Sequence, residues 1–500
     1  MRANETVTKL APQVGIEVEY ADHSRFGGAT SLKLQENLRS LFRPVHKVLR
    51  RTGPEYVVRH GEKLLLDLFG SAGLQEIQDG RGKISKSVLY PDARTIAPET
   101  VVFSSGEEAM RLPVSRKSLP ELHDIVADLA TGVRRPVNGT AAFAGQFPGF
   151  TLAGPRESRV ADGADVVYLG HNTVAVRTKT AQVVVDPWFF PTSSHYPAGY
   201  QPITRRELGQ VDCVAITHSH PDHFHPGSLL QFHRDTQILV PRVPRESILS
   251  LQMADRLREL GFTRVTEMDW WSTVKVGDIS VSAAPFHGEQ PTVDDQLYPE
   301  IRNHGNCYVV RTPRVSCAMV ADCGRDRDGS VARIALEAYR RWGAIDVLFS
   351  GFRGWNLYPI QYFESSVRQY LLFVPPMLYG VRQSIMSNVD EAVDTAEAWH
   401  AQYLVPYADG GAPWFSDIGL GPKFGENGLD REGEWIGFDA LPERCVEAVQ
   451  KRSTPVPGVV AGSAVEAMLL RPGDAVSWSK KKPVVVQSET HRWPWGDTLL

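Results

Sequence analysis

The sequence predicts an α/β fold in which sheets are covered by helices. Short β-rich segments follow one another directly after residue 165, and strands alternate with amphipathic helices later in the chain. A run of strands followed by strand and helix in alternation is typical of sheets with helices packed on them. Several of these strands end in His or Asp, which places polar side chains where the strands run out.

The first 160 or so residues are expected to form a separate α+β unit. Apolar residues recur at helical spacing in residues 31–42, a second apolar cluster covers residues 63–69, and residues 119–129 predict an amphipathic helix. No cluster of ligand residues accompanies them. We expect a lid, a dimerisation surface that gives a homodimer, or a partner-docking domain; a packing extension is the alternative. Residues 145–163, with glycines and prolines, predict a linker.

Beyond the linker the elements follow in order. Strands are predicted at residues 166–169, 173–176, 182–185, 211–216, 237–240, 274–276, 279–282, 307–310, 316–320, 346–349 and 403–406. Helices are predicted at residues 246–260, 331–342, 390–400 and 442–452. The region beyond about residue 425 is Gly-rich, and its Trp-bearing tail has no assigned function. We therefore predict three parts, at residues 1–163, 164–425 and 426–500.

Composition and charge limit the classes of partner. The chain of 500 residues is 42% hydrophobic and 22% charged, with a formal net charge of -4. This balance removes the electrostatic argument for a nucleic-acid or membrane partner. The N-terminus opens no apolar signal segment and the apolar runs are too short to span a bilayer, so we expect a cytoplasmic protein. The five cysteines lack C-x-x-C spacing and are expected to be buried thiols.

One stretch after the predicted strand 211–216 carries the densest set of metal-binding side chains. It has the pattern H-x-H-x-D-H, formed by His218, His220, Asp222 and His223. Neutral imidazoles and a carboxylate suit zinc, iron and manganese. The two pairs of ligands suit two ions side by side. A polar loop with surface histidines is the alternative, which the density of His and Asp directly after an apolar strand disfavours.

Three later predicted strands are also followed by polar residues. His287 and Glu289 follow the strand at 279–282, Asp322 follows the strand at 316–320, and Asp409 follows the strand at 403–406. Each is a weak signal alone, because an Asp before Gly commonly belongs to a turn. In this order after the central motif, they form a pattern.

Over about residues 165–425 the chain resembles the metallo-β-lactamase-fold superfamily. Residues 168–173 and 185–187 are similar to its opening hairpin, and residues 217–223 match its signature. The resemblance implies an αββα sandwich that follows the separate N-terminal domain in the sequence, with two metals in a groove at one edge of the sheets. The implied ligands are His218 and His220 for the first metal, Asp222 and His223 for the second, His287 at the third motif, and Asp322 as the bridge.

Two positions depart from the hydrolase pattern of this family. Where a final histidine commonly follows a Val-Pro strand end, this chain has Tyr407-Ala408-Asp409, so either Asp409 replaces that ligand or the second site is weaker. His400 precedes the strand and is expected on the surface at its opposite end. Glu289 adds a carboxylate, and carboxylate-rich sites favour iron or manganese over zinc. A loop carboxylate in water is the alternative for Glu289, and the sequence does not choose between His287 and Glu289.

Residues 286–291 and the large N-terminal domain look like the diiron subgroup of this fold. That subgroup includes β-hydroxylases that oxidise amino acids held on carrier proteins. The resemblance implies a dinuclear-metal oxygenase acting on an amino-acid-like or carrier-bound substrate in natural product biosynthesis. Two iron ions are favoured over zinc or manganese, and Asp222 and Glu289 are the expected catalytic residues. The alternative is a metal-dependent hydrolase of an ester, lactone or phosphodiester.

Other aromatic and histidine residues are secondary candidates. His171, in a tight turn, and His225, just after the motif, are expected to orient a ligand or to cap the following helix. The aromatic side chains that could cradle a substrate or complete a core are Phe352, Trp355, Tyr358, Trp414 and Phe415.

Overall fold

The computed structural model describes the fold at the residues that follow. They are residues 15–19, 100–105, 108–113, 118–131, 163–189, 203–220, 222–244, 251–288, 303–326, 328–351, 356–357, 383–384, 386–408, 442–453, 464–479 and 482–486. The predicted helix at 31–42, the apolar cluster at 63–69, nearly all of the linker, and the Trp-bearing tail lie outside these residues. The aromatic substrate candidates lie outside them too.

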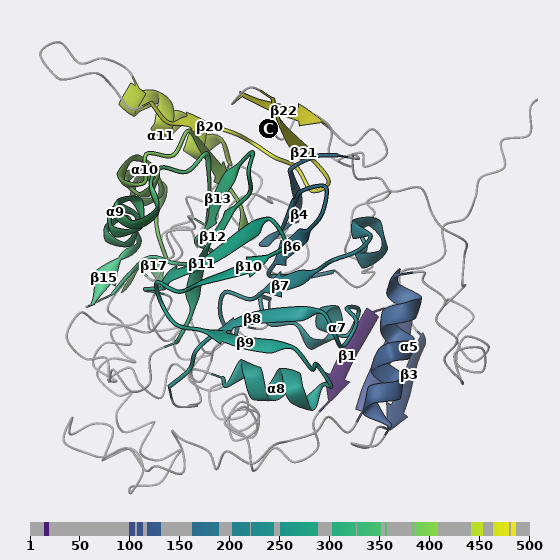
Figure 1. Cartoon of the computed structure of the whole chain (residues 1–500). Helices are drawn as coiled ribbons and strands as arrows, with labels where there is room; N and C mark the ends of the chain where they lie inside the picture. The colour runs from purple at the N-terminus through teal and green to yellow at the C-terminus, as the bar shows by residue number, and fades with distance from the viewer. Residues whose placement is uncertain are drawn as a thin grey trace, which may run out of the picture.

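Two large mixed sheets form the centre of the molecule (Figure 1). The first has the order β22-β21-β4-β5-β6-β7-β8-β9 and the second the order β10-β11-β12-β13-β16-β19-β20. The first sheet consists of β4 (Val166–Gly170), β5 (Thr173–Arg177), β6 (Gln182–Val185), β7 (Cys213–Ala215), β8 (Gln237–Pro241), β9 (Val265–Met268), β21 (Ala475–Ser479) and β22 (Lys482–Val486). The second consists of β10 (Thr273–Val276), β11 (Ile279–Pro285), β12 (Asn306–Arg311), β13 (Ser316–Met319), β16 (Val347–Ser350), β19 (Tyr403–Pro406) and β20 (Glu466–Ala467).

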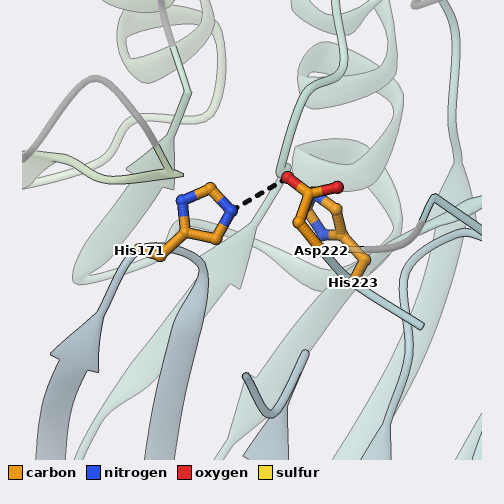
Figure 2. A group of neighbouring side chains, drawn as sticks. All are labelled: His171, Asp222 and His223. Atoms are coloured by element: carbon orange, nitrogen blue, oxygen red, sulfur yellow. Dashed lines mark hydrogen bonds and ion pairs between the residues drawn. The ribbon is translucent and has the colours of Figure 1, made fainter. Parts of the chain in front are cut away.

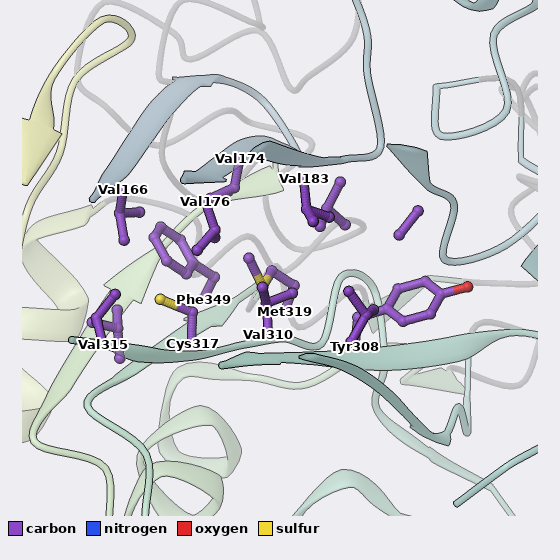
Figure 3. Close-up of a cluster of buried hydrophobic side chains, with 14 of the residues drawn as sticks. Val166, Val174, Val176, Val183, Tyr308, Val310, Val315, Cys317, Met319 and Phe349 are labelled. Carbon is purple, nitrogen blue, oxygen red and sulfur yellow. The ribbon is translucent and has the colours of Figure 1, made fainter. Parts of the chain in front are cut away.

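The two sheets pack face to face through an apolar core (Figure 3). Val174 and Val176 of β5 meet Val310 and Met319 of the second sheet in this core. Successive side chains of a strand point to opposite faces, so Ala175 between the two valines faces the other way and joins a different cluster. The near-continuous apolar strands of the sequence therefore follow from burial on both faces.

Helices cover the outer face of each sheet. On the first sheet lie α5 (Leu119–Thr131), α7 (Pro226–Leu229) and α8 (Met253–Glu259), whose apolar residues share one core cluster with the sheet. On the second lie α9 (Val331–Trp342), α10 (Val389–Ala398) and α11 (Pro442–Ser453), which share another. The order of layers is helix, sheet, sheet, helix. The αββα sandwich predicted from the sequence is confirmed.

Smaller elements surround the sandwich. A separate sheet is formed by β1 (Gly15–Glu19), β2 (Thr100–Ser105) and β3 (Glu108–Pro113). Two short hairpins are β14 (Arg325–Asp326) with β15 (Gly329–Ser330) and β17 (Asn356–Leu357) with β18 (Gln383–Ser384). A turn of 3-10 helix, η2, spans Arg205–Leu208. All five cysteines are buried and free, as predicted.

Segments on both sides of the predicted metal domain contribute to the sandwich. Helix α5 precedes the expected boundary at residue 163, yet the ring nitrogens of its His123 lie 2.9 Å from the Leu260 carbonyl oxygen and 2.8 Å from that of Phe232. Beyond residue 425, β21 pairs with β4 and β20 pairs with β19. The division at residues 163 and 425 remains a prediction, and neither boundary is a limit of the packed layers.

The predicted helices differ from the structure mainly at their ends. Helix α9 has the predicted bounds, whereas α10 ends two residues before the predicted limit at residue 400. The segment expected to be helical at 246–260 is described as helix over Met253–Glu259, before Gly261 with a φ of 103°. Within the described parts of the chain, no helix combines the length and apolarity that crossing a bilayer requires.

Candidate metal centre

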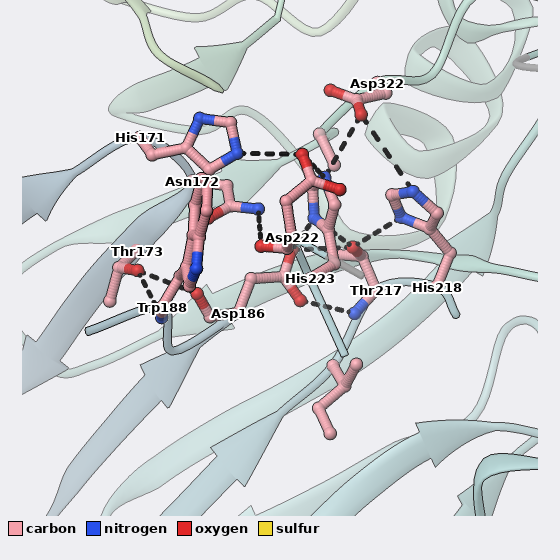
Figure 4. Close-up of polar contacts among 12 residues, drawn as sticks. His171, Asn172, Thr173, Asp186, Trp188, Thr217, His218, Asp222, His223 and Asp322 are labelled. Carbon is pink, nitrogen blue, oxygen red and sulfur yellow. Dashed lines mark hydrogen bonds and ion pairs between the residues drawn. The ribbon is translucent and has the colours of Figure 1, made fainter. Parts of the chain in front are cut away.

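Strand ends from both sheets meet at one edge of the sandwich, where a polar network lies (Figure 4). Strands β6 and β7 run parallel, so the residues after each strand leave the sheet on the same side. Asp186 follows β6, and the stretch from Thr217 to His223 follows β7. Asp322 follows β13 of the second sheet. The sandwich therefore brings together residues from three separate parts of the sequence.

The Asp186 carboxylate holds the histidine-rich stretch in position through hydrogen bonds. Its side chain is fully buried, and its Oδ1 accepts a hydrogen bond from the Thr217 backbone N–H at 2.7 Å. Its Oδ2 accepts from the Thr217 hydroxyl at 2.6 Å and from His223 Nδ1 at 2.8 Å. Because a carboxylate only accepts hydrogen bonds, the proton of the His223 ring lies on Nδ1. The Nε2 atom of His223 then faces the centre, as in metal sites where a carboxylate orients the ligand.

Thr217 also orients the ring of His218. Its hydroxyl donates to Asp186, so its oxygen is available to accept from His218 Nδ1 at 3.0 Å. The His218 ring also stacks on Phe286, with centroids 5.0 Å apart. These contacts turn His218 Nε2 toward Asp322, whose Oδ2 lies 4.0 Å away.

The buried group His218, His223 and Asp322 has the chemistry and spacing of a metal site. Asp322 Oδ2 lies 3.1 Å from His223 Nε2, and one ligand atom from each of the three lies within 4.8 Å of the others. Ligand atoms bound at about 2.0–2.2 Å around one ion stand about 3–4 Å apart. Two imidazoles and a carboxylate therefore fit a zinc, iron or manganese ion at this position.

A second group lies beside the first and shares His223 with it. It consists of His171, Asp222 and His223 (Figure 2). His171 Nε2 lies 2.9 Å and His223 Nε2 lies 3.8 Å from Asp222 Oδ2. Asn172, which follows His171 in the β4–β5 turn, donates from Nδ2 to the Asp222 carbonyl at 2.7 Å. Because the single acceptor nitrogen of His223, Nε2, binds one ion, two ions side by side would divide the other donors of the two groups between them.

The carboxylates and histidines of the centre stabilise each other's charged forms. Burial alone raises the pKa of Asp222, but His223 and His171 outweigh it and hold that pKa well below its usual value. Burial likewise opposes a charge on His223, but Asp222, Asp322 and Asp186 raise its pKa well above 6.5. The same carboxylates that favour the protonated form of His223 would favour a metal cation bound in place of that proton.

Four of the eight metal ligands predicted from the sequence enter these two groups: His218, Asp222, His223 and Asp322. His220 packs edge-on to His218 with centroids 4.6 Å apart, and its Nε2 lies 3.5 Å from Asn303 Nδ2. His287 Nδ1 lies 3.2 Å from Asp326 Oδ1, and its Nε2 lies beside Gly329. Neither His220 nor His287 belongs to a group of three among the described residues. Glu289 and Asp409 lie outside those residues.

Other residues acquire roles that their sequence positions only partly signalled. His225 caps α7 as expected, since its Nδ1 accepts from the Ser228 N–H at 3.1 Å, and burial lowers the pKa of His225 to about 4. His400 is exposed just before β19, as predicted. Asp186 is not among the ligands predicted from the sequence, where residues 185–187 are only similar to the opening hairpin of the family. The available signal was its place after β6, the parallel neighbour of the strand that carries the motif.

Known proteins resemble the chain at the level of sequence. A family model described as the beta-lactamase superfamily domain matches residues 181–407. The 4-amino-L-phenylalanyl-(CmlP-peptidyl-carrier-protein) 3-hydroxylase of Streptomyces venezuelae is 31% identical over 215 residues, which cover 40% of this chain and 39% of that protein. A metal-dependent hydrolase of Koribacter versatilis is 31% identical over 121 residues, 24% of this chain and 46% of that protein. The matched segments thus span less than half of either relative.

Solved structures resemble the chain in fold. CmlA, a diiron beta-hydroxylase from Streptomyces venezuelae, superposes with a TM-score of 0.55 and 19% identity, over 96% of this chain and 99% of CmlA. The predicted resemblance is confirmed as a similarity, in sequence to the Streptomyces venezuelae hydroxylase and in fold to CmlA. Residues 181–407 therefore match the beta-lactamase superfamily domain in sequence, and the chain has the metallo-β-lactamase fold.

Proposed function

We propose that this protein is a dinuclear-metal enzyme, and that it is a diiron, O2-dependent hydroxylase of an amino-acid-like substrate held on a carrier protein. The observation that carries the proposal is the pair of adjacent donor groups, which together place three imidazoles and two carboxylates at one edge of the sandwich. The substrate class is supported by the named activity of the Streptomyces venezuelae relative, which acts on an amino acid attached to a peptidyl carrier protein.

Each donor residue of the chain would have its own role at the metal centre. His218 would hold the first ion and His223 the second, each through Nε2, Asp222 would join His223 at the second, and Asp322 would bridge the two. When bound, two irons would supply the activation of O2. Asp186 keeps the proton of His223 on Nδ1, away from the ions. The Asp222 side chain is 32% exposed while those of His218 and His223 are fully buried, so Asp222 is the most exposed of these three donors.

The choice of iron as the metal depends on a further carboxylate. The described groups contribute three imidazoles and two carboxylates, which suit zinc, iron and manganese. Glu289 would add a third carboxylate. The alternative, a dizinc hydrolase, is supported by the identity with the Koribacter versatilis hydrolase, and it would use the same donors.

Metal analysis of protein purified without added metal tests the proposal. We expect two irons per chain with a charge-transfer absorption, and oxidation of an amino acid loaded on a carrier protein but not of the free amino acid. Two zincs per chain, with turnover of an ester or phosphodiester, would overturn the oxygenase assignment.

A carboxylate variant tests the contribution of Glu289. Glu289→Gln removes a charge without changing the size of the side chain, and we expect it to lose iron. Glu337→Gln is the matched control, because Glu337 lies on the exposed side of α9 and pairs with Arg341. Equal iron content in wild type and both variants would contradict a ligand role for Glu289.

A further inference from the structure

The described end of β19 offers no imidazole to the second metal. Tyr407 and Ala408 stand where the family commonly has its final histidine. Tyr407 is fully buried, and its hydroxyl oxygen accepts from the Ala321 backbone N–H at 2.7 Å, directly before Asp322. Burial raises the pKa of Tyr407 well above its usual value, so the phenol stays neutral. Its role is to support the loop that carries Asp322.

His171 lies against this same strand end. Its carbonyl oxygen accepts from the Ala408 N–H at 2.7 Å and from the Tyr168 hydroxyl at 3.0 Å. Its φ of 50° is in the left-handed region, where a non-glycine residue is uncommon and needs support from its surroundings. The hairpin turn between β4 and β5 therefore brings a histidine from the start of the domain to the place of the missing one.

The ring of His171 is held in the centre rather than in solvent. Its side chain is 2% exposed and packs edge-on against Trp188, with centroids 4.5 Å apart. From there Nε2 reaches to 2.9 Å from Asp222 Oδ2, and one atom each of His171, Asp222 and His223 lies within 4.8 Å of the others (Figure 2). These separations match ligand atoms around one ion.

We propose that His171 is the terminal imidazole ligand of the second metal, beside Asp222, His223 and the bridging Asp322, and that it takes the place of the final histidine of the family. This inference rests on the proposed dinuclear centre, but it does not depend on whether the metals are iron or zinc. A role limited to hydrogen bonding with Asp222 is the competing account, and the two differ in what a glutamine at this position does.

Cobalt titration of the metal-stripped full chain distinguishes them, because Co²⁺ reports its ligands by absorption. Wild type is expected to bind two equivalents. His171→Gln retains an N–H donor for Asp222 but not an imidazole, so the second equivalent should weaken by more than the roughly 100-fold upper limit for loss of an orienting partner, while the first is unchanged. His171→Gly suits the positive φ, and added imidazole should restore the second equivalent and its spectrum.

His400 provides the control histidine. It also has a positive φ, of 52°, and it is exposed and contacts Tyr339 with ring centroids 4.3 Å apart. His400→Gly should bind two equivalents with wild-type affinity, and circular dichroism checks that every variant is folded. If His171→Gln binds both equivalents as wild type does, the inference is overturned and the dinuclear centre stands. If wild type itself binds fewer than two, the proposed centre fails and the inference fails with it.

Discussion

Replacing Asp186 by asparagine tests how the centre is oriented. Asparagine keeps the size of the side chain and tolerates the φ of 44° at this position, so the change is confined to hydrogen bonding. All three partners of the Asp186 carboxylate donate to it. The amide nitrogen must face either the Thr217 N–H, where two donors oppose each other, or His223. In the second case the ring proton moves to Nε2, which then donates where a metal requires an acceptor.

The size of the effect follows from these contacts. Leaving one buried donor without an acceptor costs about 1–3 kcal/mol in the free energy of unfolding. Loss of the partner that orients a ligand histidine weakens metal affinity about 10–100-fold, which is about 1.4–2.7 kcal/mol. Competition of the protein with a chelator for Co²⁺ measures the second quantity, and urea unfolding of the metal-free protein measures the first.

Asp346 supplies a control with the same local chemistry. Its Oδ2 accepts from the Ser316 backbone N–H at 2.8 Å and from the Ser316 hydroxyl at 2.7 Å, at the start of β13 and away from the centre. Asp346→Asn should lose stability but keep its affinity for cobalt. If Asp186→Asn bound cobalt within about twofold of wild type, the proposed orientation of His223 by Asp186 would be wrong.

Two further predictions concern protonation and support of the bridging residue. In metal-free protein, the raised pKa of His223 means that its contribution to stability is fully present below pH 6.5 and is lost as the pH rises through the raised value. Because metal binding displaces this proton, cobalt affinity should rise about tenfold per pH unit above pH 6.5 until that pKa is reached; equal affinities across this range would contradict the assignment. Tyr407→Phe removes the acceptor of the buried Ala321 N–H and should cost about 1–3 kcal/mol in urea unfolding. Tyr403→Phe, at the other end of β19, is the control, and equal losses in the two variants would argue against this role.

The sequence by itself determined the layers of the fold. Strands such as β5 and helices such as α9 depend on local apolar periodicity, which can be counted along the chain. The motif after β7 also predicted that His218, Asp222 and His223 lie together, because a dense run of potential ligands after a buried strand favours a metal site. The end of β13 predicted Asp322 for a related reason, although only together with the motif.

Only the tertiary structure decided which side chains converge. His171 reaches Asp222 because the β4–β5 turn has a left-handed backbone and docks on β19, more than two hundred residues later in the chain. His287, which ends a strand as the motif does, instead turns toward Asp326 of a neighbouring hairpin. Strand ends in a sequence show where polar residues leave a sheet. The pairing of strands, the register between them and the φ angles of single turn residues decide where those side chains point, and none of these is a local property of the sequence.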